Sequence, residues 1–67
     1  MDFQEYVSRG IAFYKARETG QAIENIEAAL RIQPDNAEIR GLLEQLKQLK
    51  QEEDQRKYYE SKIESLK

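Results

Sequence analysis

The spacing of the aromatic residues at the start of the chain constrains the fold more than any other feature. Three aromatic residues and one glycine recur at intervals of three and four: Phe3, Tyr6, Gly10 and Phe13. This spacing places them on one face of a helix. A glycine inside a helix costs about 1 kcal/mol relative to alanine, so Gly10 needs a structural reason. We therefore expect a second helix to approach the first closely at Gly10.

The second helix is expected to follow after a short break. Thr19 and Gly20 interrupt the apolar pattern, and we expect Thr19 to cap a helix that runs to Gln33. The next apolar residues form one stripe with two neighbours beside it: Ala22, Ile26 and Ala29, then Ile23 and Leu30. The small alanine side chains allow the two helix backbones to come near each other. Pro34 ends this helix, because the residue before a proline is driven out of helical geometry.

A third, much longer helix is expected after Pro34. Asp35 and Glu38 have the spacing of a capping box, in which Asp35 caps the helix and Glu38 reaches back. Residues 36–67 contain no proline, so at about 1.5 Å per residue this helix would run on the order of 45 Å. The sequence therefore predicts an all-α chain with helices over about 3–16, 20–33 and 36–66.

The apolar pattern changes along the third helix. Its first half carries a continuous stripe: Ile39, Leu42, Leu43, Leu46 and Leu49. Residues 50–57 contain no apolar residue, and we expect two ion pairs there: Glu52 with Arg56, and Glu53 with Lys57. Helical spacing then resumes with Tyr59, Ile63 and Leu66, next to Tyr58. This last stripe is either a contact surface or a frayed end, and we favour contacts between chains.

Residues 3–36 resemble a single tetratricopeptide repeat (TPR). Six residues match the family pattern in type and spacing: Tyr6, Gly10, Phe13, Ala22, Ala29 and Pro34. Ile26 stands where an aromatic residue is usual and Arg9 where leucine is usual. The resemblance implies a TPR-like helical hairpin over residues 1–36, then a capping helix and helical extension over 37–67. Arg9 has two interpretations: its stem lies on the core edge, or its head pairs with an acidic group such as Glu5.

Composition and charge exclude several function classes. The 67 residues include no cysteine and no histidine, and the net charge of -2 comes from interleaved acidic and basic residues. This leaves no basic stripe for nucleic acid and no apolar run of about 20 residues to cross a membrane. The acidic start, residues 1–5, lacks the layout of a signal peptide. We expect a soluble, cytoplasmic protein without nucleic-acid or membrane partners.

Catalysis is not expected. Without histidine or cysteine, a nucleophile and its base would have to come from serine, lysine or carboxylates, and no elbow motif surrounds the serines. The consecutive acids at 52–54 point in different directions on a helix, so they do not converge on a metal. We predict no catalytic residue, no cofactor and no metal.

The TPR resemblance implies a binding groove lined by the first helix, at Gln4, Val7, Ile11, Tyr14 and Lys15. Val7, Ile11 and Tyr14 share a face, which is either a docking surface or is covered by the third helix or by another copy of the chain. The predicted partner-binding residues fall in two groups: Val7, Ile11, Tyr14 and Lys15, and Tyr59, Ile63 and Leu66.

A single repeat hairpin cannot bury both its faces, which points to a neighbouring molecule. A two-fold dimer is the commonest closed solution. The sequence thus predicts a non-catalytic protein–protein interaction module, which self-associates as a homodimer or binds a peptide or helix of another protein. The alternatives are a structural spacer of coiled-coil type, although residues 50–57 interrupt its heptads, and a piece of a larger TPR array.

Overall fold

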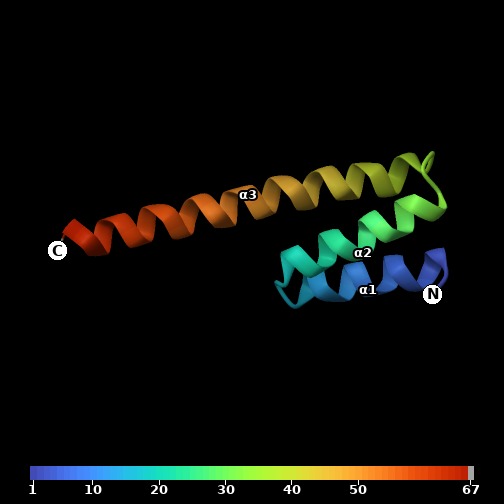
Figure 1. Ribbon diagram of the computed structural model, residues 1–67, viewed down its shortest axis with the longest axis horizontal. Helices are drawn as coiled ribbons and strands as arrows, with labels where there is room; N and C mark the ends of the chain where they lie inside the picture. Colours follow the sequence, from blue (N-terminus) through green and yellow to red (C-terminus); the bar gives the residue numbers. More distant parts are fainter. Residues whose placement is uncertain (67) are drawn as a thin grey trace.

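The computed structural model describes residues 1–66, with side chains as far as Lys62. It contains three helices: α1 (Phe3–Lys15), α2 (Thr19–Ile32) and α3 (Ala37–Leu66) (Figure 1). The described residues contain no strand, so the all-α prediction is confirmed. The long C-terminal helix and the two short helices before it are also confirmed, because every boundary lies within one residue of its expected position.

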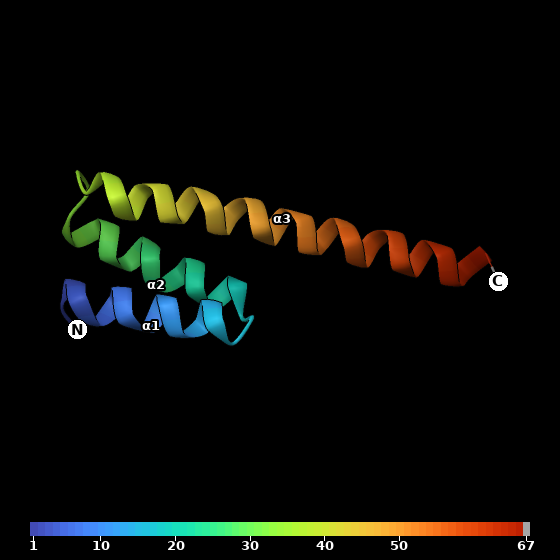
Figure 2. The same cartoon turned by 180° about the vertical axis from the view of Figure 1, so that it is seen from behind.

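The helices are arranged side by side, with α2 between α1 and α3 in both views (Figures 1 and 2). The chain reverses direction at each connection, so α1 and α2 form a hairpin and the first half of α3 packs along α2. The second half of α3 extends past the hairpin, which makes the molecule 49 Å long. We refer to residues 54–66 as the projecting half of α3.

The core is small and is centred on α2. Four hydrophobic residues are fully buried: Ala22, Ile26, Ala29 and Leu46. Gly10 is buried against them, and a Cβ atom there would lie 2.6 Å from the Ile26 Cδ1 atom and 3.4 Å from the Ala22 carbonyl oxygen. The close approach of α1 and α2 at Gly10 is therefore confirmed.

The turn between α1 and α2 is closed by backbone hydrogen bonds. Arg17 has a φ angle of 63°, in the left-handed region that favours glycine. Its N–H donates to the Tyr14 carbonyl at 3.0 Å, and the Glu18 N–H donates to the Phe13 carbonyl at 2.8 Å. This pair of bonds is the Schellman pattern, and it satisfies carbonyls that the end of α1 would leave unpaired.

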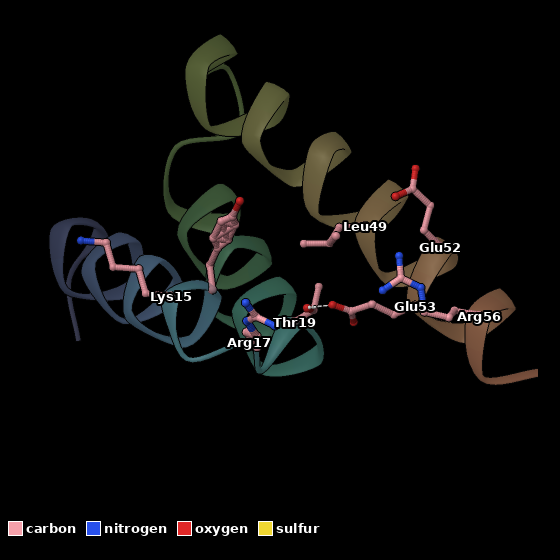
Figure 3. A pocket seen from close by; sticks show the side chains of 8 residues that line it. Lys15, Arg17, Thr19, Leu49, Glu52, Glu53 and Arg56 are labelled. Atoms are coloured by element: carbon pink, nitrogen blue, oxygen red, sulfur yellow. Dashed lines mark hydrogen bonds between the residues drawn. The ribbon is translucent and has the colours of Figure 1, made fainter. Parts of the chain in front are cut away.

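The start of α2 differs from the prediction. Glu18, not Thr19, holds the cap position, and its side chain makes no capping hydrogen bond. Thr19 is instead the first helical residue and only 3% exposed. Its hydroxyl donates to the Glu53 Oε1 atom on α3 at 2.9 Å (Figure 3). The prediction was wrong because the partner of Thr19 lies 34 residues away, beyond the reach of a local capping rule.

The start of α3 also differs. Asn36 caps the helix, because its Oδ1 atom accepts a hydrogen bond from the Ile39 N–H at 3.1 Å. The Asn36 side chain is held in place by its own bond to Gln33 Oε1 at 3.2 Å. Asp35 lies one residue before the cap position, too far from the N–H of the third helical residue to accept its hydrogen bond. The expected Asp35–Glu38 capping box is therefore wrong.

The ion pairs of α3 form a different pattern from the expected one. Among the described residues, neither predicted pair is made: Glu52 with Arg56, or Glu53 with Lys57. Lys50 instead lies 3.5 Å from Asp54, while Glu53 bonds Thr19. Arg9 is exposed and makes no ion pair with Glu5.

Candidate interaction surface

An apolar hollow separates α1 from α3. Because α3 packs on α2 along its first half, it lies against α1 only weakly. The hollow has a volume of about 260 Å³, and six residues line it: Gly10, Ile11, Tyr14, Lys15, Leu42 and Leu46. Its floor thus comes from the close approach at Gly10, and its walls come from two helices that are not neighbours in the chain.

Three of the four predicted contact residues of α1 border this hollow and stay open to solvent: Ile11, Tyr14 and Lys15. Ile11 is 41% exposed and Tyr14 is 46% exposed, while Val7 is half-buried. The third helix therefore does not cover this stripe. Lys15 is exposed, and its side chain points away from α3 (Figure 3), so its stem rather than its ammonium group borders the hollow.

The hollow continues along α3 as a groove. Tyr14 borders every part of it, and α3 contributes eight residues: Leu42, Gln45, Leu46, Gln48, Leu49, Glu52, Glu53 and Arg56. The groove ends where Thr19 and Glu53 join α2 to α3 (Figure 3). We call the whole surface, from Leu42 to Arg56 on α3 and from Gly10 to Lys15 on α1, the α1–α3 groove.

Charges of both signs stand at the polar end of the α1–α3 groove. Arg17 comes from the turn after α1, and Glu52 and Arg56 come from α3. Among the described residues none of these three makes an ion pair within the chain. Their charges are therefore available to a partner of complementary charge.

The second predicted group of contact residues lies on the projecting half of α3, away from the groove. Tyr59 is 61% exposed and Tyr58 is 62% exposed, with their ring centroids 5.6 Å apart at an interplanar angle of 75°. The Lys62 ammonium lies 5.9 Å from the Tyr58 ring centroid, close enough for a cation–π contact. The side chains of Ile63 and Leu66 lie outside the described residues.

Sequence reasoning missed the α3 wall of the groove. The signal was present, because residues 42, 45, 49, 52, 56 and 59 keep intervals of three and four through the polar segment. The lack of apolar residues over 50–57 hides this face in the sequence. A face can still be continuous when charged residues occupy some of its positions.

The described part of the chain holds no group of three or more histidine, cysteine or acidic side chains placed to bind a metal ion. Within the same part, no helix combines the length and the apolar character needed to cross a membrane. Comparisons with protein-family models, with curated proteins and with solved structures found no match to this chain.

Proposed function

We propose that this chain is a non-catalytic protein–protein interaction module: a TPR-like hairpin with a capping helix that self-associates as a homodimer in the cytoplasm. The observation that carries the proposal is the open α1–α3 groove. Its apolar hollow leaves Ile11 and Tyr14 41% and 46% exposed, beside charges that make no ion pair with the described residues of the chain. Burying such a surface against another molecule is favourable by roughly 25 cal/mol per Å² of apolar area.

The small core supports the same proposal. A chain of 67 residues hides only about 60% of its unfolded surface, so its stability alone is marginal. Of the described hydrophobic residues, four are fully buried, and two of these are alanines. A neighbouring molecule that covers the groove would add apolar burial that the single chain lacks.

Binding a helix or peptide of another protein is the second candidate, since an apolar hollow flanked by two helices suits a helical ligand. A structural spacer is the third, and the projecting half of α3 favours it. The peptide-binding candidate differs from self-association in one measurable property, because it does not require the purified chain to form a dimer. A coiled-coil spacer would associate through α3 alone, so its association would not depend on Ile11.

Sedimentation equilibrium and thermal unfolding at several concentrations test the proposal. We expect a dimer whose melting temperature rises with protein concentration. Ile11→Ala should weaken the dimer, because Ile11 lines the hollow. Ile32→Ala is the matched control, since Ile32 is 49% exposed and lies outside the groove. A monomer mass with a concentration-independent melt would contradict self-association.

A further inference from the structure

The α3 wall of the groove contains residues at heptad spacing. Five of the α3 residues that line the groove are separated by three, four, three and four residues: Leu42, Gln45, Leu49, Glu52 and Arg56. Leu46, Gln48 and Glu53 line it beside them. Such alternation is the seam of a coiled coil, in which alternate positions face a partner helix. Tyr59 extends the rhythm by three residues and is 61% exposed. The seam therefore runs without a break from the groove onto the projecting half of α3.

The sequence carries the same rhythm to the end of the helix, through Ile63 and Leu66, whose side chains lie outside the described residues. The complete seam has apolar residues toward both ends and a charged centre formed by Glu52 and Arg56. At about 1.5 Å per residue, the 24 steps from residue 42 to residue 66 span on the order of 36 Å.

The seam is symmetric about Asp54. Leu42 and Leu66 lie twelve residues on either side of it, and Leu49 and Tyr59 lie five residues on either side. Glu52 and Arg56 lie two residues on either side, with opposite charges. Two copies of α3 that run in opposite directions and cross at Asp54 thus pair Leu42 with Leu66 and Leu49 with Tyr59, and bring Glu52 of each copy to the partner's Arg56. The same register places the polar Gln45 opposite Ile63.

We propose that the occupant of the α1–α3 groove is the projecting half of α3 from a second copy of this chain, packed antiparallel in this register. The proposal rests on the self-association proposed above and specifies its geometry. Each copy inserts its projecting half beside the other copy's Ile11 and Tyr14, so one two-fold axis fills both grooves. The partner's Tyr59 packs at Leu49, in the groove that Tyr14 borders.

Charge decides the direction of the two helices. In a parallel, in-register pair, Glu52 would face the partner's Glu52 and Arg56 the partner's Arg56, so like charges would repel at both layers. In the antiparallel pair, Glu52 of each copy faces Arg56 of the other copy. The two-fold axis therefore produces two Glu–Arg contacts. A charged pair at the centre of a mainly apolar seam also disfavours other registers, because a shift of one heptad leaves both charges without partners.

The packing of the hairpin allows this arrangement. Figure 2 shows the projecting half of α3 clear of α1 and α2, so another chain can reach it. The contact between α3 and α2 uses Leu43 and Leu46 and the bond from Thr19 to Glu53. Leu46, Thr19 and Glu53 also border the groove, so a helix laid in it would cover these contacts from outside without breaking them.

Charge reversal tests the register. Glu52→Arg alone and Arg56→Glu alone should each raise the dissociation constant of the homodimer roughly 100-fold, since both central layers then hold like charges. An equal mixture of the two variants should associate as tightly as the parent chain, because every layer regains opposite charges. The double variant E52R/R56E should also recover the dimer.

Two further charge reversals serve as matched controls. Glu44→Arg and Lys47→Glu make the same changes at exposed positions of α3 outside the groove, and they should leave the dissociation constant within twofold. Circular dichroism of each variant checks that the helices remain.

The outcomes separate this geometry from the broader proposal. A wild-type dimer that is insensitive to both single reversals would overturn the antiparallel register and leave self-association standing. A wild-type chain that stays monomeric would overturn both. Loss of association in both single variants, with recovery in their mixture, supports the register.

Discussion

The two halves of α3 share one backbone conformation and have opposite surroundings. Residues 37–53 pack along α2, where Leu46 is 2% exposed and Glu53 accepts the hydrogen bond from Thr19. Residues 54–66 extend past the hairpin, and Tyr58 and Tyr59 there are 62% and 61% exposed. A helix is thus built by local hydrogen bonds and good helix formers, whereas burial depends on a neighbour that only the first half has.

This comparison implies an uneven distribution of stability. The packed region, residues 3–53, should unfold as one unit because its buried residues all contact α2. None of the described side chains of the projecting half of α3 belongs to this core, so we expect that half to open at little free-energy cost in the monomer. Four sets of substitutions test this contrast, from the largest expected effect to the smallest.

Gly10→Leu should unfold the packed region. A Cβ atom at Gly10 would already lie 2.6 Å from Ile26 Cδ1 and 2.8 Å from Ile26 Cγ1, and Ile26 is fully buried. We expect a loss of at least about 3 kcal/mol in the free energy of unfolding, measured by chemical denaturation. Gly41→Leu is the control, since nothing lies within 4 Å of a Cβ atom at Gly41. Equal melting temperatures for the Gly10 variant and the parent chain would show that α1 and α2 do not approach each other closely at Gly10.

Leu46→Ala should cost about 2–3 kcal/mol, because it leaves a cavity between α2 and α3. Tyr58→Ala removes a larger side chain from the same helix, yet in the monomer it should change the free energy of unfolding by less than about 0.5 kcal/mol. Denaturation at concentrations low enough to suppress association makes the comparison. Similar losses in the two variants would mean that the projecting half of α3 is packed as firmly as the first half.

Thr19→Val should cost about 1 kcal/mol, since valine has a similar shape but cannot donate to Glu53. Glu53→Gln retains an acceptor and should cost less. Amide hydrogen exchange should show faster opening of α3 around residue 53 in the valine variant, with α1 unchanged. If protection there did not change, the Thr19–Glu53 bond would not mark the end of the packed region.

Arg17→Gly should stabilise the packed region by about 0.5 kcal/mol. Glycine adopts the φ angle of 63° without steric strain, although it also gains freedom in the unfolded chain. Thermal unfolding at one fixed concentration measures the shift. Arg17→Ala is the control, because alanine removes the same charge but keeps the Cβ atom. If the two variants melted alike, the charge of Arg17 rather than its backbone angle would set the difference.

The sequence determined the helices of this protein and one of their contacts. Local rules placed all three helices, because apolar spacing, Pro34 and strong helix formers act within a few residues. The glycine between aromatic residues predicted the crossing at Gly10, since a helix accepts the cost of glycine only where another backbone comes close. The helix caps were less predictable. The cap of α3 is Asn36, one residue later in the chain than the expected Asp35.

Only the tertiary structure decided how the helix faces meet. Spacing identified Val7, Ile11 and Tyr14 as one stripe, but it did not determine whether α3 would cover them. That outcome depends on where α3 settles on α2, through the packing of Leu46 with Ile26 and the bond between Thr19 and Glu53. Those contacts join residues far apart in the sequence. The open α1–α3 groove therefore follows from the combined geometry of three helices, which no single helical pattern contains.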